Sequence, residues 1–463
     1  MFWLMSYTTT KFLGCYDIVF IYVNPLHAQL ICMLGTIIFV QLPYTIARNV
    51  QNGLPEAVTG GALNLSRTFN GYGEIETQSH AVNNQSLASW NLARNDSGRI
   101  SGKTETVDGT TSNYAYTYDP MGRLLTVTKD GGLVQEYRYD ANGTRNYEMN
   151  AFRGIVGRTF TYSDEDHLLT AGSVSYLYDY DGFLVSKTDG SDVTQFDYST
   201  RGELKSVTLS GGTSIAYVHD PLGRRIAKKV NGAIVEKYLW QGLTRLLAVY
   251  DGGDGLLMRF AYADARMPVA MTRSDGTYYL AYDQVGSLRI VADASGNVVK
   301  KIEYDSFGNI IIDTAPAFEV PFGFAGGLHD RDTDLVRFGY RDFDPDVGRW
   351  TAKDPILFAG GDTDLYGYCL NDPVNAFDPY GLFWAEFGKG FSHHMATKAW
   401  ETGKTPSLDA LAAELLEALK SFDPNYDKDF KPWQPWPVEF FLEPYLEKER
   451  LKDTGDFPAI PCA

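Results

Sequence analysis

Residues 118–124 read Tyr-Asp-Pro-Met-Gly-Arg-Leu, and this pattern returns along most of the chain at intervals of about 20 residues. An aromatic residue and an Asp are followed by two variable residues, a Gly and a polar or basic residue. Asp and Gly around two variable residues favour a type I turn that closes through a left-handed glycine. The copies begin at Phe69, Asn95, Tyr118, Tyr139, Tyr162, Tyr180, Tyr198, His219, Tyr282 and Tyr304.

The segments between these turns alternate in polarity. Residues 124–128 and 204–209 show a period of two with β-branched residues, which is typical of half-buried strands. Second turns carry Asn-Gly or Asp-Gly, the strongest short-range hairpin signals, as at residues 189–190 and 231–232. Each unit therefore predicts one antiparallel hairpin, and the chain as a whole is expected to be all-β.

Composition excludes several classes of function. Lys and Arg number 41 against 58 Asp and Glu, a net charge of −17, which argues against sequence-independent nucleic-acid binding. The four cysteines, Cys15, Cys32, Cys369 and Cys462, lie far apart and form no metal-binding motif. We therefore expect neither a disulfide framework nor a zinc site, and no cofactor.

The N-terminal segment, residues 1–47, differs from the rest. No charged residue occurs between Asp17 and Arg48, and residues 26–47 approach the length of roughly 20 residues needed to span a bilayer. We expect this segment to act as a membrane anchor or export signal. The alternatives are a buried apolar segment or a stretch translated from a misplaced start.

The Tyr-Asp-x-x-Gly-Arg unit resembles the YD repeat of bacterial Rhs (rearrangement hot spot) proteins, and the resemblance covers about residues 65–382. It implies a strip of β-hairpins that forms at least part of a hollow shell around a C-terminal toxin. The expected divisions are a YD-repeat array at 65–322, an Rhs-repeat-associated core at 323–382 and a variable tail in the toxin position at 383–463.

The core block carries the most specific part of this resemblance. Residues 338–350 read Phe-Gly-Tyr-Arg-Asp-Phe-Asp-Pro-Asp-Val-Gly-Arg-Trp, and the block ends at residues 378–382 with Asp-Pro-Tyr-Gly-Leu. The family cleaves itself after this Leu with a pair of carboxylates. By position the resemblance assigns the pair to Asp354 and Asp378 and the cleaved bond to Leu382–Phe383. One departure is Leu357, where the family often has Gly.

The implied chemistry is that of an aspartic protease. Two neighbouring carboxylates share a proton because both cannot ionise cheaply, so one activates water while the other polarises the carbonyl. The alternative is that Asp354 and Asp378 only begin Asp-Pro turns, the role that we expect for Asp372.

The tail at 383–463 shows no catalytic motif. Apolar residues at helical spacing predict an amphipathic helix at 407–421. The pair His393-His394 lacks the accompanying ligands or glutamate of a nuclease or deaminase, so we interpret it as surface residues.

The leading hypothesis is an Rhs-type polymorphic toxin, or its C-terminal remnant, that releases the tail as an effector. Its partners would be an immunity protein and a secretion machinery, and it would be secreted or held at the bacterial cell surface. One alternative is a non-enzymatic surface module that binds carbohydrate or protein through exposed tyrosines. Another is a non-functional gene fragment.

Overall fold

The computed structural model describes residues 44–382 except 51 and 264, together with short strand segments on either side. All of these residues belong to one compact unit, Met1–Gly388. Before residue 44, β1 (Thr8–Thr10) pairs with β2 (Ile18–Phe20), and β3 (Cys32–Met33) pairs with β4 (Thr36–Ile37). The expected helix at 407–421, the pair His393-His394 and most of the 26–47 segment lie outside the described residues.

A single strip of antiparallel strands dominates the unit, and from β5 to β30 each strand pairs with the next one in sequence. The prediction of an all-β hairpin strip is therefore confirmed. In its first half the strands are β5 (Thr45–Arg48), β6 (Pro55–Gly60), β7 (Leu63–Phe69), β8 (Ile75–Val82), β9 (Gln85–Arg94), β10 (Ile100–Val107), β11 (Thr110–Tyr118), β12 (Leu124–Lys129), β13 (Gly132–Tyr139), β14 (Arg145–Asn150), β15 (Ile155–Tyr162), β16 (Leu168–Ala171) and β17 (Val174–Tyr178). The second half contains β18 (Leu184–Asp189), β19 (Asp192–Tyr198), β20 (Leu204–Thr208), β21 (Ser214–His219), β22 (Arg225–Val230), β23 (Ala233–Gln241), β24 (Arg245–Asp251), β25 (Leu256–Ala261), β26 (Ala270–Arg273), β27 (Gly276–Tyr282), β28 (Leu288–Asp293), β29 (Val298–Tyr304) and β30 (Ile310–Asp313).

The Tyr-Asp-x-x-Gly turn has the geometry that its residues dictate. Asp119 Oδ1 accepts hydrogen bonds from the backbone N–H groups of Met121 and Arg123, each at 2.9 Å, and Gly122 closes the turn with φ +89°. The Asp carboxylate therefore satisfies backbone donors, while Gly supplies a conformation that other residues adopt only at a cost. One copy differs from the expectation, because the unit assigned to Tyr180 begins at Tyr178 and turns at Asp179.

The recurring position of the tyrosine in the repeats also has a physical reason. The Tyr118 hydroxyl donates to the carbonyl of Ile100 at 2.7 Å, and the Tyr139 hydroxyl donates to that of Leu124 at 2.7 Å. Each tyrosine thus bonds to the first residue of the strand in the preceding unit. This contact joins successive hairpins through side chains as well as through the backbone ladder.

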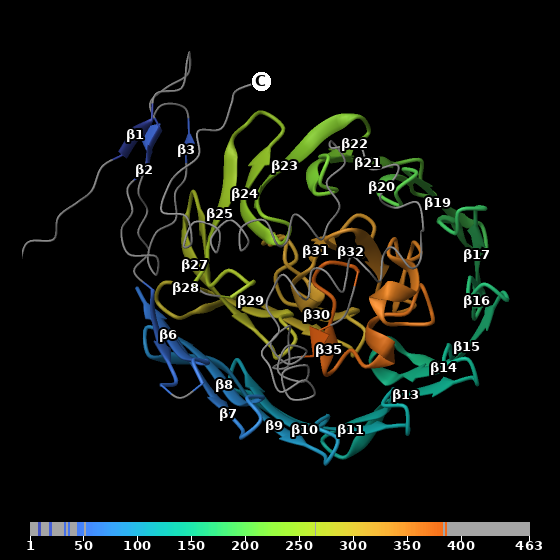
Figure 1. The fold of residues 1–463 in the computed structure, drawn as a ribbon, viewed down its shortest axis with the longest axis horizontal. Coiled ribbons are helices and arrows are strands. Elements are labelled where there is room, and N and C mark those ends of the chain that lie inside the picture. Colours follow the sequence, from blue (N-terminus) through green and yellow to red (C-terminus); the bar gives the residue numbers. More distant parts are fainter. Residues whose placement is uncertain are drawn as a thin grey trace, which may run out of the picture. The chain divides into compact units, whose positions relative to one another are not determined.

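The strip bends so that its late strands lie inside its early ones (Figure 1). The backbone N–H of Ala62 donates to the Tyr279 hydroxyl at 3.1 Å, and the Gln78 amide donates to the carbonyl of Tyr282 at 2.7 Å. Side-chain hydrogen bonds thus join β27 to β8 and to the turn between β6 and β7.

The segment 323–382 lies within the curve of the strip (Figure 1). It contains β31 (Leu328–Asp330), β32 (Leu335–Phe338), β33 (Arg341–Asp344), β34 (Arg349–Trp350) and β35 (Ala376–Phe377), and β35 pairs with β36 (Ala385–Glu386). Short 3₁₀ turns are η1 (Ala151–Arg153) in the strip and η2 (Phe324–Gly326), η3 (Leu357–Gly360) and η4 (Cys369–Asn371) in the segment. Among the described residues no helix has the length and apolar character needed to cross a bilayer.

This segment packs against the row of YD turns. Its aromatic residues Phe338, Phe343, Trp350 and Tyr368 form a buried cluster of their own. Side chains of this segment lie against successive turn glycines: Asn371 at Gly143, Tyr366 at Gly182, Ala352 at Gly202, Tyr340 at Gly223 and Phe324 at Gly308. The repeat therefore builds a rim that positions the 323–382 segment and the candidate site within it.

Candidate functional site

The fold brings Asp354 and Asp378 to one place, although 23 residues separate them in the sequence. Asp354 lies just before η3, where its Oδ1 accepts the Ile356 N–H at 2.9 Å. Asp378 directly follows β35, and its Oδ1 accepts the N–H groups of Tyr380 at 3.1 Å and Gly381 at 2.8 Å. Backbone donors thus fix both carboxyl groups.

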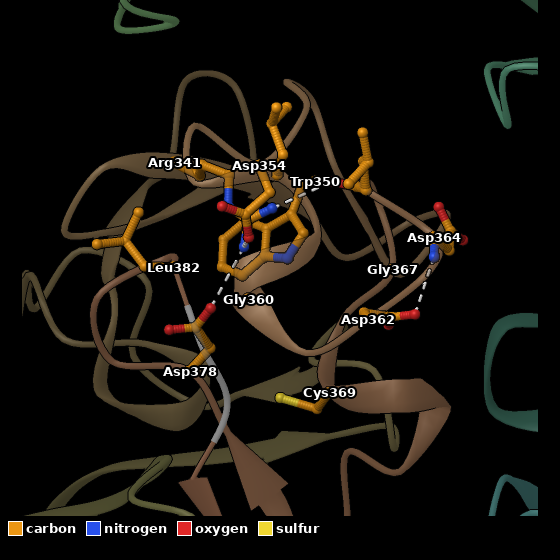
Figure 2. Close-up of a pocket in the computed structure, with 12 residues that line it drawn as sticks. Arg341, Trp350, Asp354, Gly360, Asp362, Asp364, Gly367, Cys369, Asp378 and Leu382 are labelled. Carbon is orange, nitrogen blue, oxygen red and sulfur yellow. Dashed lines mark hydrogen bonds and ion pairs between the residues drawn. The ribbon is translucent and has the colours of Figure 1, made fainter. Parts of the chain in front are cut away.

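Arg341, at the start of β33, lies between the two carboxyl groups (Figure 2). Its Nη2 is 2.7 Å from Asp354 Oδ2 and 3.4 Å from Asp378 Oδ2, and its Nε donates to the Gly381 carbonyl at 2.6 Å. One guanidinium therefore contacts both acids and the residue before Leu382.

The carbonyl of Leu382 lies close to Asp354. A Cβ placed on Gly360 would be 2.7 Å from the Leu382 carbonyl oxygen and 2.8 Å from Asp354 Oδ2. Both oxygens therefore border one small space, which only a residue without a side chain leaves open. Leu382 itself is buried, with 3% of its surface exposed.

A cavity of about 20 Å³ lies at this point, a volume that accommodates one water molecule. Figure 2 shows its walls. The lining residues are Arg341, Trp350, Asp354, Leu357, Gly360, Asp362, Asp364, Leu365, Gly367, Cys369, Asp378 and Leu382.

Burial controls the titration of the two acids. Desolvation raises the pKa of Asp354 to about 6, against the opposing effect of Arg341. Desolvation likewise raises the pKa of Asp378 to about 6, opposed by Arg341 and by the backbone N–H groups of Leu382, Tyr380 and Gly381. Near pH 6, states with one acid protonated and the other ionised are well populated.

Other chemistries fit the site less well. Burial, followed by the negative charge of Asp378, raises the pKa of the Cys369 thiol well above its usual value, so this thiol is not an activated nucleophile. Within the part of the chain that the structure describes, no group of three or more His, Cys, Asp or Glu residues is arranged to hold a metal ion.

The sequence placed both carboxyl groups in this site but missed Arg341 and Gly360. From the sequence, only the repulsion between the carboxylates of Asp354 and Asp378 was considered. The Arg341 guanidinium, which offsets part of this repulsion, was not included. Arg341 stands inside the most specific motif of the core block, between Tyr340 and Asp342, and that position was the available signal. Asp372 lies elsewhere, where it accepts hydrogen bonds from Asn375 and pairs with Arg99 at 3.2 Å.

Comparison with known proteins identifies the family. The family model described as Teneurin YD-shell matches residues 41–374. The chain belongs to this YD-repeat family. The membership of a YD-repeat family predicted from the sequence is therefore confirmed.

Relatives come from animals and bacteria. Human Teneurin-1 is 32% identical over 413 residues, which are 80% of this chain and 15% of that protein. Double-stranded DNA deaminase toxin A of Burkholderia cenocepacia (strain H111) is 30% identical over 312 residues, 60% of this chain and 21% of that protein. A chain of the Photorhabdus luminescens Tc holotoxin pore has a TM-score of 0.43 at 16% identity, over 73% of this chain and 21% of that one. The chain thus matches only 12% to 15% of the length of the teneurins to which it is similar.

Proposed function

We propose that this chain cleaves itself after Leu382 and thereby separates the tail at 383–463 from a YD-repeat shell. The observation that carries the proposal is that Asp354, joined to Asp378 through Arg341, borders the same small space as the Leu382 carbonyl oxygen, beside a cavity of one-water size. An Asp-Pro turn alone does not require buried carboxyl groups joined by an arginine.

The geometry suggests a role for each group. Three backbone N–H groups favour the ionised form of Asp378, so this carboxylate serves as the base that takes a proton from water. Asp354 borders the same space as the Leu382 carbonyl oxygen, so its protonated form polarises that carbonyl and then protonates the leaving nitrogen. Arg341 is a positioning residue that holds both acids and the Gly381 carbonyl.

The released tail is the proposed effector of an Rhs-type polymorphic toxin. This assignment rests on the position of the tail after the core block and on the similarity of this chain to a bacterial protein named as a DNA deaminase toxin. We propose that the protein is secreted or held at the cell surface, with an immunity protein for the tail and a secretion machinery as partners. Residues 26–47 remain a proposed membrane segment.

Intact mass spectrometry of the purified chain under denaturing conditions tests the cleavage. We expect one fragment that ends at Leu382 and a second that begins at Phe383. Asp354→Asn and Asp378→Asn should each leave one intact chain, because an amide cannot carry out the proton transfer. Asp372→Asn is the matched control and should still cleave, since Asp372 does not line the cavity. A single uncut wild-type species would refute the proposal.

A second candidate function is a surface module that binds carbohydrate or protein without catalysis. The exposed aromatic side chain of Tyr72, with 88% of its surface accessible, and the exposed Tyr180 favour it. Both lie in YD turns, where aromatic rings could stack on a sugar or pack against a partner. Binding of the Asp378→Asn chain to a glycan array, lost in Tyr72→Ser and Tyr180→Ser, would support this function.

A further inference from the structure

The chain is held on the N-terminal side of the Leu382–Phe383 bond. The carbonyl of Tyr380 accepts the Tyr340 N–H at 2.8 Å, and the carbonyl of Gly381 accepts Arg341 Nε at 2.6 Å. Leu382 is itself buried. None of these contacts involves the bond that would be cut, so the carboxyl group of a cleaved Leu382 would stay beside Arg341 and the two acids.

The chain is also held on the C-terminal side of the same bond. Strand β36 pairs in antiparallel register with β35, Ala376 opposite Glu386 and Phe377 opposite Ala385. β35 leads directly into Asp378. The second and third residues after Phe383 are thus tied by backbone pairing to the strand that ends at the candidate base.

We infer, if the proposed cleavage takes place, that the same site also rejoins the cut bond. Two reacting groups held in position meet at a far higher effective concentration than free ones, which offsets part of the usual preference for hydrolysis. The cavity beside them, of about 20 Å³, has room for about one water molecule next to the reacting groups.

The reverse step balances without a co-reactant. The neutral amine of Phe383 attacks the carboxyl carbon of Leu382 and loses a proton to one of the two acids. The other acid protonates one carboxyl oxygen, which leaves as water while the C–N bond forms. Repeated cutting and rejoining therefore exchanges both oxygens of the Leu382 carboxyl group with solvent water.

Oxygen exchange tests the inference on the full-length protein as purified. The cleaved wild-type protein is transferred into ¹⁸O-labelled water at pH 6. The masses of both fragments are then measured by mass spectrometry over several days. We expect the fragment that ends at Leu382 to gain one heavy oxygen and then a second. The fragment that ends at Ala463 should gain none, because an ordinary carboxyl group exchanges very slowly at this pH.

A matched pair of variants tests the part played by the strand pairing. Glu386→Pro removes a backbone N–H from β36, whereas Glu386→Ala changes the side chain and keeps that N–H. We expect cleavage in both variants, normal exchange in Glu386→Ala and exchange about tenfold slower in Glu386→Pro.

The outcomes separate this inference from the proposed function. An uncut protein would refute the cleavage itself. A cleaved protein whose Leu382 fragment takes up no heavy oxygen would leave the cleavage standing and overturn the rejoining. Exchange at the same rate in Glu386→Pro and Glu386→Ala would overturn the rejoining too, because water that adds to the Leu382 carboxyl group and leaves again exchanges the same oxygens without the amine.

Discussion

Glu105 on β10 and Arg289 on β28 form a bidentate ion pair across the curved strip, with N–O distances of 2.9 and 3.0 Å. Both side chains are buried. Burial alone would raise the pKa of Glu105, but the Lys103 ammonium and the Arg289 guanidinium hold that pKa well below its usual range. The pair therefore contributes stability above the pKa of the unfolded glutamate, and this contribution is lost as the pH falls through the folded value.

The first prediction is that Arg289→Met destabilises the fold by about 3 kcal/mol, because it leaves part of the Glu105 charge buried without its partner. Urea unfolding of an uncleaved Asp378→Asn chain at pH 7 measures the loss. The double variant Glu105→Gln, Arg289→Met should recover part of it, since the Glu105 carboxylate is then no longer buried without Arg289. If Arg289→Met unfolds at the same urea concentration as the Asp378→Asn chain, other contacts hold the early and late strands of the strip together.

The second prediction compares two turn glycines with nearly equal backbone angles, Gly73 at φ +80° and Gly182 at φ +78°. Alanine in either position costs about 1 kcal/mol for the left-handed conformation. A Cβ on Gly182 would also lie 2.5 Å from the buried Tyr366 hydroxyl, whereas the nearest atom to a Cβ on Gly73 is Leu54 Cδ1 at 3.4 Å. Urea unfolding in the same uncleaved background should therefore show a loss at least twice as large for Gly182→Ala. Equal losses of stability in the two variants would mean that the 323–382 segment is not packed tightly against the turn at Gly182.

The hairpin strip could be predicted because its signals are local. The Asp119 carboxylate and Gly122 form a turn from residues within a few positions of each other, and the alternation after the turn identifies the strand. The bending of the strip could not be predicted in this way. It depends on pairs such as Glu105 with Arg289, whose partners lie 184 residues apart and carry no spacing signal.

The same distinction applies to the candidate site, where some residues could be predicted from the sequence and others could not. Asp354 and Asp378 stood out because they sit in motifs with a family resemblance. Gly360 did not, because its role is an empty space beside the Leu382 carbonyl that only the folded backbone defines.

The third prediction concerns that space. Gly360→Ala would place a methyl group within 3 Å of both the Leu382 carbonyl oxygen and Asp354 Oδ2, and small displacements of reacting groups slow catalysis by about 100-fold. We expect the variant to fold and to accumulate uncut chain, measured by denaturing gel electrophoresis over time. Gly71→Ala is the control, since a Cβ there meets no atom within 4 Å. Cleavage of Gly360→Ala at the wild-type rate would place the reacting carbonyl elsewhere.

The fourth prediction concerns Leu357, which adopts a left-handed φ of +53° at the start of η3 and has 48% of its surface exposed. Leu357→Gly should raise the stability of the uncleaved Asp378→Asn chain by up to about 1 kcal/mol, because glycine adopts this conformation without a steric penalty. The gain is limited by the greater freedom of glycine in the unfolded chain. Urea unfolding measures it, and a loss of more than 1 kcal/mol would mean that the Leu357 side chain has a packing role.

The last prediction is the pH dependence of cleavage. Burial raises the pKa values of both Asp354 and Asp378 to about 6, and the reaction needs one acid ionised and the other protonated. Below these pKa values both acids are protonated and no base remains, whereas above them both are ionised and no acid remains. The rate should therefore peak near pH 6 and fall about tenfold for each pH unit well to either side. Uncut Gly360→Ala chain, transferred from pH 9 to buffers between pH 4 and pH 8, allows the rate to be followed by mass spectrometry. A rate that rises steadily to pH 8 would exclude a protonated carboxyl group from the mechanism.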